Sequence, residues 1–370
     1  MASQANESIS GRGVSLNVHK TILFVLALAL SVFLVSCAGL PGGNPTVRAS
    51  KAIASCDSFT GDYKGGWKLN DGTDSGPLAV QVIALGKGEY RAVFFDEFDV
   101  PTEPLAAING QIEGANVRLT RVDPGVGTFD LKADAVIAGD KLTGTFDAQP
   151  GVGTFELTKT IRLSPTLGAK PPAGAIVLFN GKNFKQWEPL QKKAGVDKVQ
   201  WALVKGRAME VKKGAGSIVT KKKFTDFKLH IEFRTPCMPE ARGQGRGNSG
   251  VYLQGRYEVQ VLDSYGLEGK DNECGGIYKV GAPLVNMCAP PMQWQTYDIT
   301  FRAPRFDSAG TKLEDARVTV IHNGVVIHDE RAIPAPTGGA LDNNVAEPGG
   351  IYLQDHGNPV QYRNIWLVRQ

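Results

Sequence analysis

The chain has 370 residues and a formal net charge of +4, from 41 Lys and Arg residues against 37 Asp and Glu residues. The two signs of charge are interspersed and form no basic stripe, so we expect no nucleic-acid partner. The 44 Gly and 21 Pro residues, in a sequence with few long helical periodicities, predict an all-β protein that is rich in turns.

Residues 1–37 are typical of an export signal. Lys20 precedes the apolar run 22–35, which is shorter than the about 20 residues that cross a bilayer and fits the about 7–15 residues of a signal-peptide core. The run ends in Leu-Val-Ser-Cys, which is similar to a bacterial lipobox and predicts that Cys37 is lipidated. The alternatives are a plain signal peptide that is cut nearby and a membrane anchor that is kept.

Lipidation of Cys37 implies that the protein is exported and is held at a membrane by its lipid anchor, in the periplasm or cell envelope of a bacterium. Residues 38–56 then form a tether, whose first part, up to residue 50, is rich in small residues, Pro and Gly. The remaining length suits two domains of ordinary size.

Residues 57–163 are the first predicted domain. Short alternating apolar runs recur between turn residues, at 78–83, 90–95, 117–120 and 141–146. This pattern predicts a small sandwich or barrel of antiparallel strands. We recognise no catalytic constellation here and interpret the domain as accessory; a carbohydrate-binding role is open, but no residue set supports it.

Residues 164–174 are the predicted linker, because their Pro and Gly residues disfavour both helix and sheet. Residues 175–370 form the second domain, in which short apolar strands alternate with turns. The Asn323-Gly324 pair between two such strands is the strongest hairpin signal in the chain.

The stretch 248–263 contains two short strands with unusually pure faces. Because alternate residues of a strand point to opposite faces, the apolar residues share one face and the polar residues the other. The polar set is Tyr252, Gln254, Glu258 and Gln260. One interpretation of this pattern is an ordinary amphipathic hairpin whose polar face is exposed to solvent. The alternative is that the polar face forms the floor of a binding cleft, since Tyr and Gln bind sugar hydroxyls.

The connection of this hairpin should have an odd number of residues. A three-residue loop at 255–257 pairs Gln254 with Glu258 and keeps both faces pure, whereas a two-residue loop mixes them. The sequence Gly-Val-Tyr-Leu-Gln at 250–254 is matched by Gly-Ile-Tyr-Leu-Gln at 350–354. We therefore predict that both stretches are strands of one concave sheet.

Several motifs, taken together and in order, resemble the 3-keto-disaccharide hydrolase family from about residue 175 to the C-terminus. The main ones are Asn-Ser-Gly-Val-Tyr-Leu at 248–253, Tyr-Glu-Val-Gln-Val-Leu-Asp at 257–263, Gly-Gly-Ile-Tyr at 275–278 and Leu-Gln-Asp-His-Gly at 353–357. The resemblance implies a concanavalin-like β-sandwich, or jelly roll, and a glycosidase that acts on sugars with a ketone at carbon 3.

Such a ketone makes the hydrogen on carbon 2 acidic, and the resulting enolate can expel the glycosidic oxygen from carbon 1 before water adds. This route needs a base, an acid and hydrogen-bond donors for the enolate oxygen. We assign base and acid to Glu258 and His356, in an order that the sequence leaves open, and expect Asp263 to orient a basic neighbour. The expected substrate-binding residues are Asn248, Tyr252, Gln254, Gln260, Tyr278 and Gln354.

Position 254 departs from the family pattern, because relatives often carry Arg where this chain has Gln254. Arg246 or Arg256 would have to replace it in binding an anion or a carbonyl group. Two other functions remain open. The chain could be a lectin-like envelope lipoprotein that binds a carbohydrate without catalysis. It could also be a structural envelope lipoprotein, although the polar Tyr and Gln residues argue against this.

The cysteines beyond Cys37 are Cys56, Cys237, Cys274 and Cys288. Disulfides persist in exported proteins, and we predict that Cys274 pairs with Cys288 because they bracket one loop; the alternative is two buried free thiols. No Cys-x-x-Cys motif or zinc-type His spacing occurs. We therefore expect no cofactor, although a single Ca²⁺ at a sandwich edge is compatible with the sequence.

Overall fold

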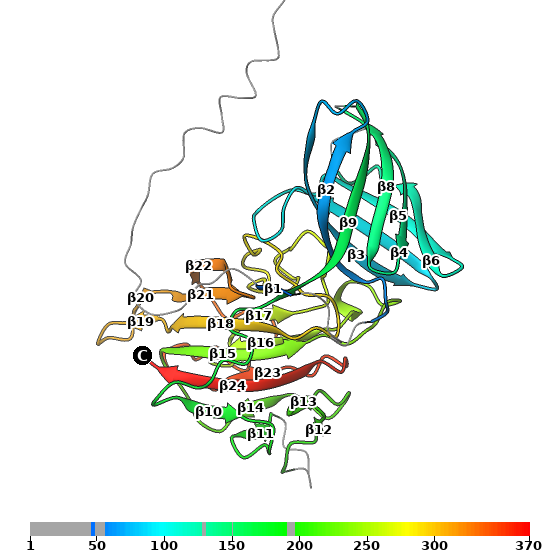
Figure 1. Ribbon diagram of the computed structural model, residues 1–370. Coiled ribbons are helices and arrows are strands. Elements are labelled where there is room, and N and C mark those ends of the chain that lie inside the picture. The colour runs from blue at the N-terminus through cyan, green and yellow to red at the C-terminus, as the bar shows by residue number, and fades with distance from the viewer. Residues whose placement is uncertain (1–45, 49–55, 128–130, 150, 191–196) are drawn as a thin grey trace, which may run out of the picture. The chain divides into compact units, whose positions relative to one another are not determined.

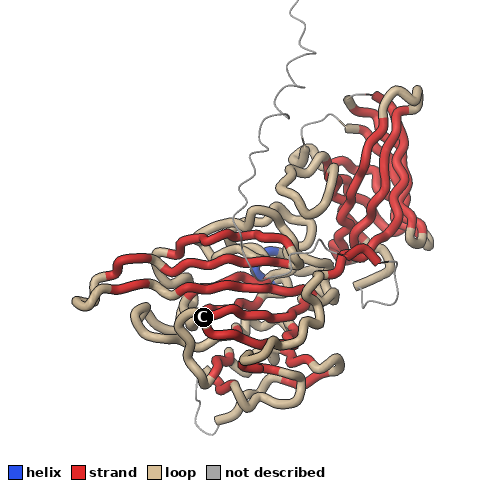
Figure 2. The backbone as a smooth tube through the Cα atoms, turned by 60° about the vertical axis from the view of Figure 1, so that its left-hand side comes forward, coloured by secondary structure: helices blue, strands red, loops and turns tan. Residues whose placement is uncertain are grey.

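The computed structural model describes residues 46–48, 56–127, 131–149, 151–190 and 197–370. The predicted signal 1–37, the lipidated Cys37 and most of the tether lie outside these residues. In the described part nearly all regular structure is strand (Figure 2), as predicted, with one short 3-10 helix at Gly243–Gly245. A search of the same residues for a helix apolar and long enough to cross a membrane finds none.

The first domain is a closed barrel of antiparallel strands (Figure 1). Each strand pairs with the next, and the last strand also pairs with the first, which leaves no open edge. The strands are β2 (Gly61–Leu69), β3 (Ser75–Gly86), β4 (Glu89–Phe95), β5 (Ala106–Glu113), β6 (Asn116–Val122), β7 (Lys132–Ala138), β8 (Lys141–Ala148) and β9 (Gly151–Leu163). The barrel alternative of the sequence prediction is thus confirmed.

A short strand before the barrel, β1 (Thr46–Arg48), pairs with the end of β9 at Ile161 to Leu163. Three residues of the expected tether are therefore part of a sheet. The pairing is made by backbone hydrogen bonds, and the composition of the tether, which is rich in small residues, does not predict it.

The second domain is a sandwich of two main sheets. The larger sheet contains β10 (Ile176–Phe179), β12 (Ala202–Val204), β13 (Ala208–Glu210), β15 (Phe227–Arg234), β18 (Gln295–Arg302), β21 (Ala316–His322), β22 (Val325–Ile333) and β24 (Gln361–Arg369). The smaller sheet has the order β11-β14-β23-β16-β17, with β11 (Trp187–Pro189), β14 (Ile218–Thr220), β16 (Ser249–Leu253), β17 (Tyr257–Val261) and β23 (Tyr352–Leu353). A two-stranded ribbon, β19 (Arg305–Phe306) with β20 (Lys312–Glu314), is attached to it.

The apolar faces of the two sheets pack on each other. Buried residues of the larger sheet and of the smaller sheet belong to one apolar cluster, which includes Phe227, Ile231, Phe233, Phe301, Val251, Leu253, Val259 and Val261. The alternate residues of β16 and β17 therefore lie on the opposite face of the smaller sheet. This face, which carries the predicted polar residues, is called the polar face below.

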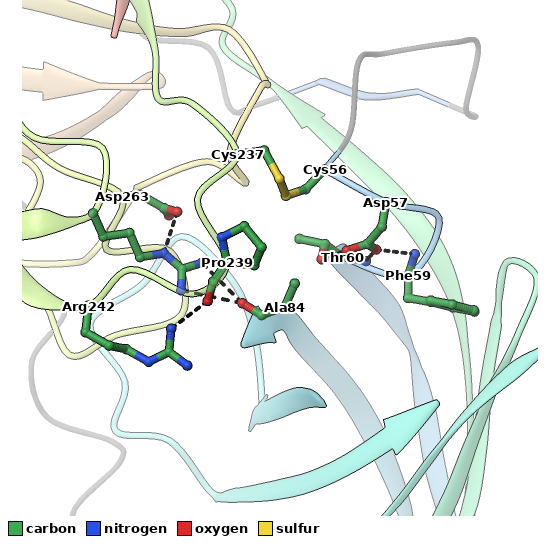
Figure 3. Close-up of a disulfide and its surroundings, with 10 residues drawn as sticks. Cys56, Asp57, Phe59, Thr60, Ala84, Cys237, Pro239, Arg242 and Asp263 are labelled. Atoms are coloured by element: carbon green, nitrogen blue, oxygen red, sulfur yellow. Dashed lines mark hydrogen bonds and ion pairs between the residues drawn. A yellow bond between two sulfur atoms is a disulfide. The ribbon is translucent and has the colours of Figure 1, made fainter. Parts of the chain in front are cut away.

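The disulfide of the structure differs from the predicted one. Cys56 bonds to Cys237 across a sequence separation of 181, with a Cα–Cα distance of 5.3 Å (Figure 3), while Cys274 and Cys288 are buried free thiols. The prediction of a Cys274–Cys288 bond is therefore wrong. It relied on closeness in sequence, whereas the fold brings Cys56, just before the barrel, against a loop of the sandwich.

The predicted linker 164–174 is bound to the outer face of the larger sheet. Thr166 donates a hydrogen bond of 2.6 Å to the Asp298 carboxylate, and the Gly168 amide donates one of 2.6 Å to Glu232. The Pro and Gly residues disfavour helix and strand in this segment. Its side chains and individual backbone amides can still form hydrogen bonds with the sheet.

Candidate active site

The hairpin of β16 and β17 has the predicted odd-length loop. Its strands pair Leu253 with Tyr257, Tyr252 with Glu258 and Gly250 with Gln260, which leaves residues 254–256 as a three-residue loop. The predicted Gln254–Glu258 pairing is wrong, because Glu258 pairs with Tyr252, two residues earlier; since the shift is by two residues, both faces remain pure. Strand β23 pairs with β16 through Tyr352 and Tyr252, so the two similar stretches do share one sheet, as predicted.

Glu258 is the central titratable group of the polar face. Its side chain is almost fully buried, at 3% exposure, and burial raises the pKa of its carboxyl to about 8, against an opposing hydrogen bond from the Tyr252 hydroxyl. Among the described residues no salt bridge involves Glu258. A carboxyl group whose pKa lies near the working pH can both accept and return a proton.

Gly250 provides the space that the Glu258 carboxyl group occupies. A β-carbon placed on Gly250 would lie 2.2 Å from Glu258 Oε1 and 2.9 Å from an edge carbon of the Tyr252 ring. Because contacts below about 3 Å do not occur for real β-carbons, any larger residue at this position must displace the carboxyl group. The glycine of the Ser-Gly-Val-Tyr stretch is thus part of the site.

Tyr252 is directly opposite Glu258 on the neighbouring strand. Its ring stacks on that of Tyr352, with centroids 4.3 Å apart and planes at 22°. The Tyr252 hydroxyl donates to the Gly338 carbonyl at 2.8 Å, and the Gln354 side-chain amide donates to that hydroxyl at 3.3 Å. Burial, and then the Glu258 charge, raise the pKa of Tyr252. The hydroxyl therefore keeps its proton, which the Gly338 carbonyl accepts in this structure.

A loop at residues 337–339 borders these two side chains. The Glu258 amide donates to Thr337 Oγ1 at 2.9 Å, and a β-carbon on Gly339, where φ is +81°, would lie 2.5 Å from the Tyr252 hydroxyl oxygen. Tyr278, whose amide donates to the Glu258 carbonyl at 3.2 Å, lies beside Gly338. The sequence analysis missed Thr337 and Gly338, because a short Thr-Gly-Gly stretch in a loop carries no distinctive signal.

The buried amides of Asn248 and Gln260 meet at a third amide that the sequence analysis also missed. Gln244 Oε1 accepts hydrogen bonds from Asn248 Nδ2 at 3.1 Å and from Gln260 Nε2 at 3.2 Å. Asn248 Oδ1 is buried and has no hydrogen-bond partner. The available signal for Gln244 was its place in the loop just before Asn248.

Gln254 leaves the polar face on which the sequence placed it. It has a positive φ of 52° in the hairpin loop, and its side-chain amide donates to the backbone carbonyls of Phe224 and Thr225 at 3.0 and 3.3 Å. Arg256, a suggested replacement for the family arginine, is engaged by Asp342 at 2.6 Å. Both side chains anchor neighbouring loops.

Asp263 lies beyond the end of β17 and forms a buried ion pair with Arg246, whose Nε is 2.6 Å from the carboxylate. Asp263 does adjoin a basic neighbour, as expected, but none of the hydrogen bonds of the described residues connects this pair to Glu258. Arg246 also reaches toward the Ala84 carbonyl of the barrel, at 3.5 Å. The pair joins the barrel and the sandwich.

His356 is exposed, and no hydrogen bond or ion pair joins it to Glu258 in the described chain. The residue before it, Asp355, is held by the amides of Gly216 and Gly357 at 3.0 and 2.9 Å. Strand β23 ends at Leu353, so the alternation that was extended to His356 does not continue that far.

The described residues contain no group of three or more His, Cys, Asp or Glu side chains placed to hold a metal ion. The polar face itself carries carboxyl, hydroxyl and amide groups. Of these, the pair of Glu258 and Tyr252 combines a proton acceptor with a proton donor.

Three comparisons place the chain among known proteins. A comparison with curated proteins finds no match. Among solved structures, a candidate glycosyl hydrolase from Parabacteroides distasonis ATCC 8503 is 39% identical, with a TM-score of 0.48, over 54% of this chain and 85% of that one. A second candidate glycosyl hydrolase from that organism is 19% identical, with a TM-score of 0.39, over 53% of this chain and 94% of that one. The family model of the 3-keto-alpha-glucoside-1,2-lyase-like domain matches residues 174–368, just over half of the chain, and the chain belongs to this family.

Proposed function

We propose that the sandwich domain cleaves 3-keto-glycosides by forming an enolate, eliminating the glycosidic oxygen and then adding water. One observation carries the proposal: a buried carboxyl group, Glu258, with a pKa raised to about 8, directly opposite the protonated hydroxyl of Tyr252. The family description names a 1,2-lyase of 3-keto-alpha-glucosides, which agrees with a reaction between carbons 1 and 2.

In the first step the Glu258 carboxylate takes the proton from carbon 2, and the released electron pair is shared with the carbon-3 ketone as an enolate. Burial strengthens the carboxylate as a base, since the same desolvation that raises its pKa destabilises its charge. The polar amide and hydroxyl groups nearby are the donors available to the enolate oxygen.

In the second step the enolate re-forms the ketone and breaks the bond between carbon 1 and the glycosidic oxygen. The departing oxygen takes a proton from the Tyr252 hydroxyl, and a carbon 1–carbon 2 double bond is left. Water then adds its hydroxyl to carbon 1 and its hydrogen to carbon 2, and the proton that Glu258 took passes to the Tyr252 oxygen, so that both side chains return to their starting states. One water is consumed, and no oxidant or reductant is needed. Aligning donor and acceptor in this way is what general acid–base catalysis requires.

The test compares a 3-keto-glycoside with the same glycoside before oxidation, in D₂O, with the purified protein. We expect cleavage of the keto compound with deuterium entering at carbon 2, and an inert plain glycoside, because no enolate forms without the ketone. Efficient cleavage of the plain glycoside would return the enzyme to the ordinary two-carboxylate mechanism. Binding of the keto-glycoside without cleavage or exchange would favour the lectin-like alternative.

The location of the protein belongs to the same proposal. We infer export and a lipid anchor at Cys37 from residues 1–37, and the Cys56–Cys237 disulfide supports an oxidising compartment. In a bacterial host, Cys37→Ser should abolish incorporation of a labelled fatty acid, whereas the wild-type chain should carry the label. A labelled Cys37→Ser protein would contradict the assignment.

A further inference from the structure

The barrel is filled with side chains at one end and open at the other. Around Val82, Ala92, Leu119 and Ile137 the interior is fully packed, and these residues are at most 1% exposed. The other end of the barrel contains a cavity of about 270 Å³. The strands β2, β4 and β8 end there, and β3, β5, β7 and β9 begin there. We call this the barrel cavity.

Aromatic rings dominate the lining of the barrel cavity. Trp67 meets Phe146 edge to face, with centroids 6.0 Å apart, and Phe94 meets Phe155 in the same manner at 5.5 Å. The rest of the described lining is aliphatic, with Ala133 among it, apart from two polar residues, Asp96 and Gln149. Both polar residues are exposed, so the interior wall itself is apolar.

Gly144 makes room for one of these rings. A β-carbon on Gly144, which points into the barrel, would lie 2.5 Å from the tip of the Phe155 ring. The backbone at Gly144 therefore lies against the tip of the Phe155 ring and leaves no room there for a side chain. Preformed apolar pockets of this kind bind apolar molecules and reject charged ones, since a charge would lose its hydration without gaining a partner.

We propose that the barrel cavity binds a small uncharged aromatic molecule of one or two rings. Its volume exceeds the about 150 Å³ of an apolar cavity that holds benzene, and small closed barrels of this strand number have room for one small ligand. The four lining rings offer edges and faces to an aromatic guest. A long alkyl chain has no room to extend, because the other end of the barrel is packed. This inference is independent of the chemistry proposed at Glu258.

The experiment is calorimetric titration of the full chain with 2-naphthol, and with 1-decanol as the aliphatic probe. We expect one saturable site for 2-naphthol per chain and at least tenfold weaker binding of 1-decanol. Equal or tighter binding of the alcohol, or no saturable 2-naphthol site, would overturn the proposal.

Two matched variants on β7 locate the site. Ala133→Trp fills the cavity and should weaken 2-naphthol binding at least tenfold, whereas Ala138→Trp, at the exposed far end of the same strand, should leave it unchanged. Unaltered binding to Ala133→Trp, or equal loss in both variants, would contradict the assignment.

Tryptophan emission gives an answer that does not depend on the folding of Ala133→Trp. Trp67 is the one of the chain's five Trp residues that lines the barrel cavity in the described structure. The ligand should change the emission of the wild-type protein, and Trp67→Phe should lose that change. A full emission change in Trp67→Phe would place the ligand elsewhere.

Discussion

Two buried carboxyl groups near strand β17 have different partners: Glu258 is the second residue of the strand, and Asp263 lies two residues beyond its end. Glu258 and Asp263 are 3% and 2% exposed, and burial raises the pKa of each. Asp263 has the Arg246 guanidinium at 2.6 Å, which opposes that rise, whereas Glu258 has only the neutral Tyr252 hydroxyl. Burial alone thus does not distinguish the two carboxyl groups; the charge of the partner does.

The largest expected effect is on turnover. Glu258→Gln should lower cleavage of a 3-keto-glycoside by about 10²–10⁴, the usual loss when an acid–base group is removed, while the fold survives. The amide has nearly the same shape but cannot take the proton from carbon 2. Steady-state kinetics together with circular dichroism check this. A variant that keeps most of its turnover would remove Glu258 from the proposed mechanism.

The second effect is on stability. Asp263→Asn leaves Arg246 buried without an opposite charge, and breaking such a pair typically costs about 3–5 kcal/mol of unfolding free energy. Denaturant unfolding should show this loss, and the Glu258→Gln protein measured beside it should show none. If Asp263→Asn were as stable as the wild type yet inactive, the two groups would have exchanged roles.

The third effect is geometric. Gly250→Ala places a β-carbon where the Glu258 carboxyl lies, and the carboxyl must move because it is the free end of a flexible side chain. A displacement of about 1 Å can reduce turnover about 10²-fold. We expect such a loss with little change in substrate affinity or unfolding temperature. Wild-type kinetics in this variant would show that the carboxyl position in the structure is not the reactive one.

The fourth effect depends on pH. The Glu258 carboxyl has a pKa of about 8 in the folded chain against an ordinary value of 4.5, so between these values unfolding releases a proton. Its contribution to stability is therefore complete below about pH 4.5 and declines as the pH rises to about 8. As the pH rises across this window, the unfolding temperature of Glu258→Gln should increase relative to that of the wild type. A constant difference would indicate an ordinary pKa for this carboxyl group.

Much of the fold was predictable because it follows from local patterns. Alternation gave the strands, and face purity gave the odd-length hairpin loop with Tyr252 and Glu258 on one face. The misses involve contacts between distant segments. The Cys56–Cys237 bond and the Gln244 amide that joins Asn248 to Gln260 depend on tertiary packing, which no spacing in the sequence records.

Gln254 was misplaced for a different physical reason. Alternation assigns a face only while the strand continues, and the chain turns into a positive φ at this residue. The same limit applies to His356, which lies beyond the end of β23 at Leu353. Strand ends are thus where a periodicity argument about side-chain direction fails first.

The smallest effect is expected at His356, which the sequence pairs with Glu258 as acid or base. Its side chain is exposed, and the hydrogen bonds of the described chain leave it unconnected to the polar face, whereas Tyr252 is directly opposite Glu258. His356→Ala should therefore leave stability within about 0.5 kcal/mol, as usual for an exposed position, and change turnover by less than about threefold. Tyr252→Phe is the matched comparison, since it removes a proton donor of the polar face and should lower turnover by about 10² or more. The reverse order, with a large loss at His356 and a small one at Tyr252, would mean that the histidine swings onto the polar face when substrate binds and supplies the proton to the departing oxygen.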